Sequence, residues 1–213
     1  VNSGYLVDLK PLLEEYGQDI IGTYSSEELA MACNLNGFVY GLPVHKEIAQ
    51  QATVFFRTDI LEKHQIDVSG VETIADVDAI FEQVAELEPD MWMLAADNTG
   101  LGKTVICDYS VGGTARVALM DLENSTTVED LLSSDEFYEW CEYNHKWFEN
   151  GWINPGAASD TESFYSYIQS GQAFAFFSDY GHPLSEADQE ANCGGVDLTM
   201  VTMGEPYATT STA

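Results

Sequence analysis

The sequence has very few cationic side chains. Of its 213 residues, 7 are Lys or Arg and 36 are Asp or Glu, and the formal net charge is -29 at pH 7. Such a charge repels nucleic-acid phosphates and anionic lipid head groups, and it therefore excludes binding to polyanions. An acidic composition of this kind is typical of a strongly hydrated surface and does not by itself identify a ligand.

Long apolar runs are also missing. No stretch approaches the ~20 apolar residues that cross a bilayer, and the first residues lack the charged and apolar regions of a signal peptide. The sequence therefore predicts no membrane-spanning segment. Because 45% of the residues are hydrophobic and 12% are aromatic, the chain can bury at least one sizeable core.

The residue spacings of common metal sites do not occur. There is no Cys-x-x-Cys pair, and the four histidines show no i, i+4 pairing on a helix. We therefore predict neither a metal centre nor a cofactor. The cysteines stand in or beside apolar stretches, which favours free thiols over disulfides. They are Cys33, Cys107, Cys141 and Cys193.

Motifs of catalysis are incomplete. The segment Gly-Leu-Gly-Lys-Thr at 100–104 resembles the end of a phosphate-binding loop, but Asp97 stands where that motif requires glycine. A carboxylate at that place repels the phosphates that the loop would hold. No Gly-x-Ser-x-Gly nucleophile elbow occurs, and carboxylate pairs have little diagnostic value in so acidic a chain. No motif supports an enzyme.

Short apolar runs alternate with amphipathic segments along the whole chain, which indicates an α/β fold. Thr73 and Asp76 have the spacing of a capping box, and an apolar stripe with helical spacing follows them as far as Pro89. Further helices are predicted from Asp8 to Gly17 and over 58–64, 126–132, 134–151 and 161–169. Strands are predicted over 38–42, 52–56, 91–96, 173–177 and 196–200.

Several aromatic rings stand at the ends of the apolar runs or in the loops that follow. They include Trp92, Tyr109, Trp152 and Tyr180. In α/β sheets the loops at strand ends gather around ligands, where flat rings stack on sugars while polar side chains bind the hydroxyl groups. The alternative is that each ring belongs to the core or its rim, and the sequence leaves both interpretations open.

Six stretches together show a common layout. They are GYLVDLKPLLEEYG at 4–17, NGFVYGLP at 36–43, VFFRTDILEKH at 54–64, the helix after Thr73 that leads to Pro89, WFENGWINP at 147–155 and QSGQAFAF at 169–176. In order and spacing, these stretches resemble the extracellular solute-binding proteins of bacterial ABC importers, the family 1 proteins that are similar to maltose-binding protein. The resemblance covers nearly the whole chain.

This resemblance implies a type II periplasmic-binding-protein-like fold, in which two lobes close on a ligand by a hinge and each lobe is a mixed sheet flanked by helices. Residues 1–44 then correspond to the end of lobe 1, 45–198 to lobe 2 and 199–213 to the crossing back. The chain is expected to be a fragment, with a signal, a lipid-anchor cysteine and the first strands before it and a helical tail after it. The implied hinge residues are His45, Lys46, Glu47, Ile48, Met200 and Val201.

The resemblance also implies a ligand site. The segment after the strand that ends near Phe177 matches the place where family members present a ring to a sugar. It contains Asp179, and Tyr180 and His182 replace the usual tryptophan. Trp92, Asp108 and Tyr109 join this predicted site because they also follow strand-like runs. Each would bind the ligand without covalent chemistry.

The implied function is the capture of an oligosaccharide for ABC permease subunits, without catalysis, cofactor or metal. The resemblance places the protein outside the cell, as a cell-surface lipoprotein or in the periplasm, and in contact with the membrane only through a lipid anchor. One alternative is a fragment of a secreted carbohydrate-active enzyme, which would show two carboxyl groups roughly 5 to 9 Å apart in a cleft. The other is a binding protein for peptides or another polar solute.

Overall fold

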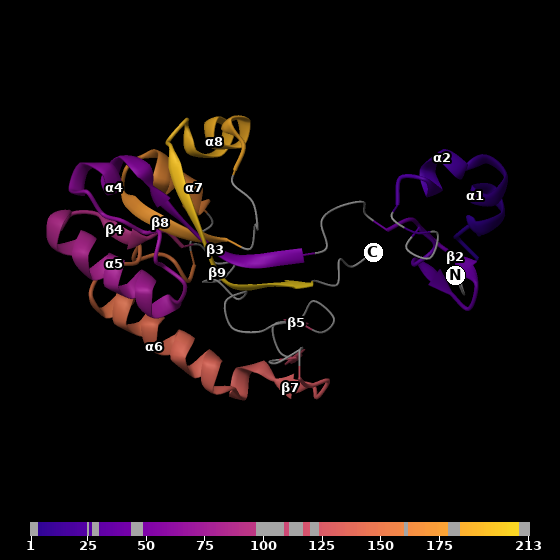
Figure 1. Ribbon diagram of the computed structural model, residues 1–213, viewed down its shortest axis with the longest axis horizontal. Helices are drawn as coiled ribbons and strands as arrows, with labels where there is room; N and C mark the ends of the chain where they lie inside the picture. The colour runs from indigo at the N-terminus through magenta and orange to yellow at the C-terminus, as the bar shows by residue number, and fades with distance from the viewer. Residues whose placement is uncertain are drawn as a thin grey trace. The chain divides into compact units, whose positions relative to one another are not determined.

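The computed structural model describes residues 4–24, 26, 30–43, 49–96, 109–110, 117–119, 124–159, 162–178 and 184–208. The chain divides into two compact units, of which the first is Val1–Ile48 with Thr209–Ala213 and the second is Ala49–Ala208. The second unit contains the main sheet and the larger core (Figure 1).

The first unit contains two short helices and a hairpin. They are α1 (Lys10–Tyr16), α2 (Gln18–Ile21), β1 (Asn34–Leu35) and β2 (Phe38–Val39). The hairpin turns at Asn36 and Gly37, whose φ angles of 53° and 87° are both positive. A two-residue hairpin turn matches the twist of its strands when both residues have positive φ, which explains this choice of residues.

Asp8, where the sequence predicts this helix to begin, contributes to the start of α1 without being its N-cap residue. The N-cap residue is Leu9, which makes no side-chain cap bond. The Asp8 carboxylate instead accepts hydrogen bonds from the N–H of Lys10 at 3.1 Å and from the N–H of Val39 at 3.0 Å. Asp8 therefore joins the helix to the hairpin, because one carboxylate can accept from several donors.

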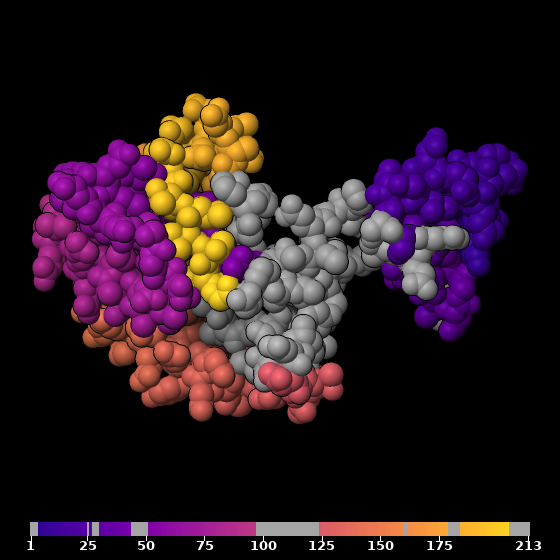
Figure 2. Space-filling view, viewed as in Figure 1, coloured from indigo at the N-terminus to yellow at the C-terminus, as the bar shows by residue number. Residues whose placement is uncertain are grey.

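The main sheet of the second unit has four strands in the order β4-β8-β3-β9 (Figure 1). They are β3 (Ala49–Arg57), β4 (Trp92–Leu94), β8 (Ala173–Ser178) and β9 (Leu198–Ala208). The pair β4 and β8 is parallel, whereas β3 is antiparallel to both β8 and β9. The sheet is therefore mixed, and β9, at one edge, has side chains that reach the surface in Figure 2.

Helices cover both faces of this sheet. They are α4 (Thr58–His64), α5 (Ile74–Leu87), α6 (Asp135–Glu149), α7 (Phe164–Gln169) and α8 (Glu186–Cys193). Along β3, Val54 and Phe56 belong to a core cluster shared with α5 and α6, and Phe55 belongs to a second cluster shared with α7 and α8. This alternation follows the two-residue period of a strand. The predicted α/β class with a mixed sheet flanked by helices is confirmed.

The predicted capping box and apolar stripe form α5. The Thr73 hydroxyl accepts from the N–H of Asp76 at 3.3 Å, and the Asp76 carboxylate accepts from the N–H of Thr73 at 2.9 Å. The stripe packs on α6, where the fully buried Trp147 lies edge-on to Phe81 at 5.1 Å between ring centroids. Each such buried ring stabilises the fold by roughly 1.5–3 kcal/mol.

A small three-stranded sheet corrects one sequence prediction. Its strands are β5 (Tyr109–Ser110), β6 (Val117–Leu119) and β7 (Glu129–Asp130), in that order. The predicted helix over 126–132 is therefore wrong: residues 129–130 are extended, and the 3-10 helix η3 (Leu131–Ser133) follows. The Asp130 carboxylate accepts from the N–H of Leu132 at 3.2 Å, so Asp130 caps the start of η3 and does not lie inside a longer helix.

Candidate functional site

One edge of the main sheet brings two segments of the chain together. Because β4 and β8 are parallel, with Trp92 beside Ala173 and Leu94 beside Ala175, both strands end at the same edge. The chain leaves this edge after Ala96 and again after Ser178. In open α/β sheets, ligands bind outside the carboxyl ends of the strands. This edge, at the carboxyl ends of β4 and β8, is the candidate site and is called the carboxyl edge below.

Hydroxyl side chains occupy neighbouring positions on three strands near the carboxyl edge. Thr53 of β3 is paired with Ser178 of β8 on one side and with Thr202 of β9 on the other. Thr53 is completely buried and its hydroxyl donates to the carbonyl of Gln51 at 2.9 Å. The sequence alone does not reveal this row, because it depends on strand register, which is known only once the strands are paired.

Asn154 is a second feature that the sequence analysis missed. Its side chain is 1% exposed and makes two hydrogen bonds of 2.9 Å with the backbone of Ala96, donating to the carbonyl and accepting from the N–H. Ala96 is the second residue after β4, which ends at Leu94, so these bonds hold the chain at the carboxyl edge. A buried amide with both groups satisfied is a stable arrangement in an apolar interior.

Most of the predicted ligand residues lie outside the part of the chain that the structure describes. Asp179, Tyr180 and His182 immediately follow the described end of β8 at Ser178, and Asp108 precedes β5. Tyr109 is the first residue of β5, where its backbone pairs with Leu119 and its side chain is outside the description. These residues stay predictions.

The structure separates Trp92 from the carboxyl edge. Trp92 begins β4 and lies beside Ala173, the first residue of β8, whereas the chain enters the segment 179–182 from the last residue of that strand. The Trp92 ring is half-buried and lies edge-on to Tyr167 of α7, with 5.3 Å between centroids. This is the packing expected of a ring at the rim of the core.

Of the predicted hinge residues, four lie outside the described part of the chain and two lie within the main sheet. His45, Lys46, Glu47 and Ile48 lie outside the described residues and directly precede β3. Met200 and Val201 lie within the main sheet, where they pair with Phe55 and Val54. The chain passes between the two compact units at 48/49 and at 208/209, and the second of these lies beyond Met200 and Val201. The strands next to these two boundaries, β3 and β9, are neighbours, with Ala49 paired with Ala208.

The ribbon of β3 and β9 extends past the ends of the other strands towards these boundaries (Figure 1). Its register shifts between Gln50 and Ala52, opposite Gly204, whose φ is +62°. The Gln51 side chain donates to the Gly204 carbonyl at 2.7 Å across this irregularity. Between the flanking pairs β9 has three residues, 204–206, where β3 has one. Extra residues in one strand bend and twist a ribbon locally, so the structure has a defined point of curvature beside the carboxyl edge.

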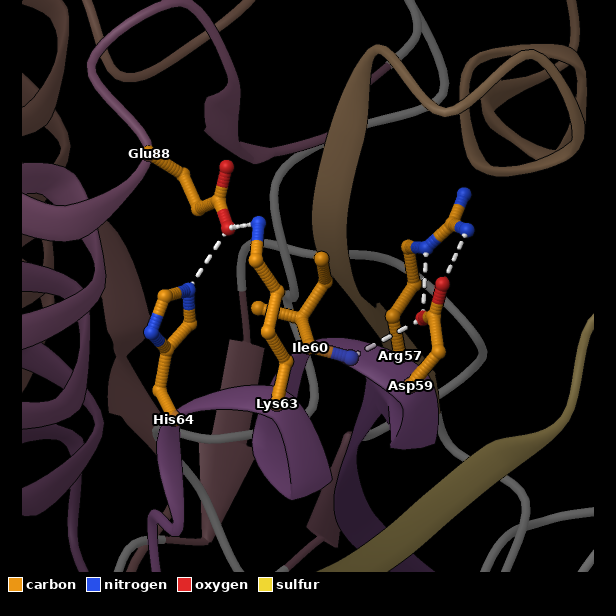
Figure 3. A network of polar contacts seen from close by, with 6 residues as sticks. All are labelled: Arg57, Asp59, Ile60, Lys63, His64 and Glu88. Carbon is orange, nitrogen blue, oxygen red and sulfur yellow. Dashed lines mark hydrogen bonds and ion pairs between the residues drawn. The ribbon is translucent and has the colours of Figure 1, made fainter.

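The charged contacts lie at the opposite edge of the main sheet, where α4 follows β3. Figure 3 shows Arg57 directed at Asp59, with 2.7 Å between Nη2 and Oδ2, and Lys63 and His64 directed at Glu88. Hydrogen bonds from Lys63 and then His64 lower the pKa of the Glu88 carboxyl, and the Arg57 hydrogen bond lowers that of Asp59. These contacts fix α4 and contribute no group to the carboxyl edge.

The remaining cations of the described residues are also paired. Lys146 bridges Asp78 at 2.6 Å and Glu82 at 2.7 Å, which raises the pKa of its ammonium group, and Lys10 lies 3.9 Å from Glu14. Every Lys and Arg that the structure describes therefore has a carboxylate partner. The polar groups that it does place at the carboxyl edge, the Asn154 amide and the hydroxyls around Thr53, are neutral.

The described residues contain no group of three or more His, Cys, Asp or Glu side chains that could hold a metal ion. Among the cysteines within the description, Cys33, Cys141 and Cys193 are free thiols, and burial raises the pKa of Cys193 to about 11. Such a thiol stays protonated near neutral pH and is a poor nucleophile. In the same part of the chain, no helix combines the length and apolarity of a membrane span.

No family model matches the chain. It is 28% identical over 166 residues to a carbohydrate ABC transporter substrate-binding protein of Streptococcus pneumoniae serotype 4 (strain ATCC BAA-334 / TIGR4), a match that covers 76% of this chain and 32% of that protein. The chain therefore spans about a third of the length of the curated relative that it matches.

Solved structures show the same fold. The N-glycan transport solute-binding protein NgtS from Streptococcus pneumoniae, in complex with Man1GlcNAc, matches with a TM-score of 0.73 and 22% identity over 95% of this chain and 45% of that one. The S. pneumoniae substrate-binding protein FusA in complex with kestose matches with a TM-score of 0.65 and 16% identity over 99% of this chain and 44% of that one. All three proteins are named as binding proteins. The resemblance to ABC solute-binding proteins and the type II binding-protein fold, both predicted from the sequence, are confirmed.

Proposed function

We propose that this chain is part of an extracellular solute-binding protein of an ABC importer, and that the intact protein captures an oligosaccharide without transforming it. The likeness of nearly the whole chain to NgtS, a solute-binding protein seen with a glycan, carries this proposal. The sequence match to a carbohydrate substrate-binding protein supports it independently. We propose no cofactor, no nucleic-acid partner and no catalysis.

The proposed ligand site lies at the carboxyl edge of the main sheet. Asp179, Tyr180 and His182 follow β8 there, and Asp108 and Tyr109 belong to the segment that follows β4 and Ala96. A tyrosine ring stacked on the apolar face of a sugar contributes on the order of 1 kcal/mol, and hydroxyl hydrogen bonds supply the selectivity. We do not include Trp92, because β4 places it at the far end of the strand.

We propose that 1–44 belongs to one lobe and that the sheet-bearing unit, Ala49–Ala208, is the other. The hinge then consists of His45–Ile48 and of the β9 residues beyond Gly204, not of Met200 and Val201. The pairing of Ala49 with Ala208 supports this revision, because it sets the two crossings side by side. Hinge closure needs a few residues at element ends that absorb the change in backbone angles.

The proposed partners of the intact protein are the permease subunits of the importer. The proposed location is outside the cell, as a lipid-anchored protein on the surface or in the periplasm. The partners are suggested by the names of the matched proteins, which describe substrate-binding components of ABC transporters, and the location is the one that the sequence resemblance implies.

Calorimetric titration of the full-length polypeptide that carries this chain tests the function. The glycans are mannose- and N-acetylglucosamine-containing oligosaccharides and fructo-oligosaccharides, each followed by chromatography of the sugar. We expect binding of at least one glycan class with no change in the sugar, and a loss of affinity of about fivefold or more in Tyr180→Ala. Turnover of a bound glycan would replace the proposal with the secreted enzyme, and binding of peptides but no glycan would replace it with a peptide-binding protein.

A further inference from the structure

The Asn154 side chain takes the place of a backbone peptide group in the hydrogen-bond ladder beside β4. Residues 152–154 run parallel to β4 on the side opposite β8, with the N–H of Leu94 donating to the carbonyl of Trp152 at 2.9 Å and Leu94 bridged to Ile153. If this parallel ladder continued, the N–H of Ala96 would donate to the backbone carbonyl of Asn154.

That backbone carbonyl has another partner. It accepts from the N–H of Ala157 at 3.0 Å, which closes the turn at Pro155 and Gly156. The side-chain amide of Asn154 takes its place, because its carbonyl oxygen and its NH2 group reproduce the acceptor and the donor of a peptide unit. Both bonds to Ala96 are 2.9 Å long and nearly completely shielded from water.

The end of β4 is therefore held on both sides. The N–H of Ala95 donates to the carbonyl of Ala175 in β8 at 2.8 Å, and Ala96 is bound by Asn154. Ala96 is the last described residue before the chain enters the segment that we propose carries ligand contacts. A polar group bound in an interior of low dielectric constant holds its partner firmly, since breaking the bond leaves two buried groups unsatisfied.

We propose that Asn154 is a positioning residue for the ligand site: by completing the ladder at Ala96 it fixes the direction in which the chain leaves β4. This inference rests on the proposed function. It assigns to Asn154 no contact with the ligand, and it predicts that the ligand affinity depends on an amide that lies in the core.

Two substitutions in the full-length protein test this role. Asn154→Asp keeps the shape of the side chain but removes the NH2 donor, so the ionised carboxylate faces the Ala96 carbonyl. Once protonated, the carboxyl group can again donate to that carbonyl and accept from the Ala96 N–H. Burial raises the pKa of such a carboxyl above its usual value of about 4. Asn154→Ala removes both bonds at every pH.

For Asn154→Asp we expect the glycan affinity to fall about tenfold or more at alkaline pH and to return towards the wild-type value as the pH falls through the raised pKa. For Asn154→Ala we expect a similar loss without recovery. The wild-type protein, titrated over the same pH range, supplies the baseline, because the partner groups on Ala96 do not titrate. Val77→Ala, a truncation of a buried α5 residue, is the control for lost stability and should keep its affinity.

Amide hydrogen exchange measured residue by residue gives a second readout that needs no ligand. In Asn154→Ala the Ala96 amide should exchange at least about tenfold faster, while the Ala95 amide, which keeps its bond to Ala175, should change little. If both variants bind as tightly as the wild type, or if the Ala96 amide stays protected, the positioning role is refuted. If the wild-type protein binds no glycan, but the Ala96 amide exchanges faster in Asn154→Ala than in the wild type, the proposed function alone is refuted.

Discussion

The two ends of the main sheet are stabilised by different chemistry. Where β3 ends and α4 begins, Arg57, Lys63 and His64 are paired with Asp59 and Glu88 (Figure 3). At the carboxyl edge, the described groups are the Asn154 amide and the hydroxyls of the row around Thr53, all of them neutral. The charged end holds a helix in place, whereas the neutral end leads into the segments that we propose bind the ligand.

This difference follows from the composition. A chain with 7 cations and 36 acids has few positive charges to place, and the described ones all neutralise carboxylates. Removing water from a carboxylate costs more than removing it from a neutral group. The proposed ligand residues Asp108 and Asp179 must therefore hydrogen-bond the sugar hydroxyls to offset that cost.

Breaking the charged end at Arg57 should have the largest effect on stability. The Arg57 guanidinium, whose side chain is 13% exposed, donates to the Ile168 carbonyl at 2.8 Å and pairs with Asp59. Arg57→Ala leaves that carbonyl without its partner, and we expect a loss of about 2 kcal/mol in the free energy of unfolding. Urea unfolding measures it, and ligand affinity should be unchanged because Arg57 is far along the strand from the carboxyl edge.

The matched control for Arg57 is Lys10→Ala. Lys10 is 3.9 Å from Glu14, and both side chains are about half exposed, so its removal should change stability by less than about 0.5 kcal/mol. Equal losses in the free energy of unfolding for Lys10→Ala and Arg57→Ala would show that the buried Arg57 contacts stabilise the fold no more than an exposed ion pair does.

A substitution at Gly204 alters the bend beside the neutral end. Its φ of +62° is unfavourable for any residue with a Cβ atom, although a Cβ built there meets no atom within 4 Å. Gly204→Ala should therefore cost about 1–2 kcal/mol from backbone strain alone. Gly70→Ala is the control, because Gly70 has the same open surroundings without a positive φ, and it should be neutral or slightly stabilising. Equal melting temperatures for the two variants would contradict this account.

The sequence predicts the elements that depend on local pattern. The capping box of Thr73 and Asp76, the stripe along α5 and the apolar run of β8 were all identified correctly. The helix α8 was missed, although Ser185 and Asp188 have the spacing of a cap and the Ser185 hydroxyl accepts from the Asp188 N–H. Its short, polar segment lacks the apolar stripe on which the helix prediction relied.

The features of the candidate site depend on contacts between distant residues. Asn154 and Ala96 are 58 positions apart, and Thr53 is 125 positions from Ser178. Strand order and register decide such contacts, and neither can be obtained from periodicity in a single segment. For the same reason the sequence alone does not reveal that Trp92 lies beside the first residue of β8, at the end of β4 away from the carboxyl edge.

A change at Glu88 should alter the pH dependence of the charged end. Hydrogen bonds from Lys63 and His64 lower the Glu88 pKa in the folded state. Its contribution to stability is therefore present above the unfolded-state pKa of about 4.5 and is lost as the pH falls through the lowered folded-state pKa. Glu88→Gln should be less stable than the wild type by up to about 1 kcal/mol at neutral pH, with the difference shrinking below about pH 4. A difference that grows on acidification would refute this assignment.

Trp92→Phe gives the sharpest comparison of the two ends. A phenyl ring retains much of the edge-on contact with Tyr167, so stability should fall by less than about 1.5 kcal/mol. Because Trp92 lies beside the first residue of β8, the glycan affinity should stay within about twofold of the wild type. A larger loss of affinity in a stable Trp92→Phe protein would move the ligand site to the charged end and reverse the functional assignment of the two ends.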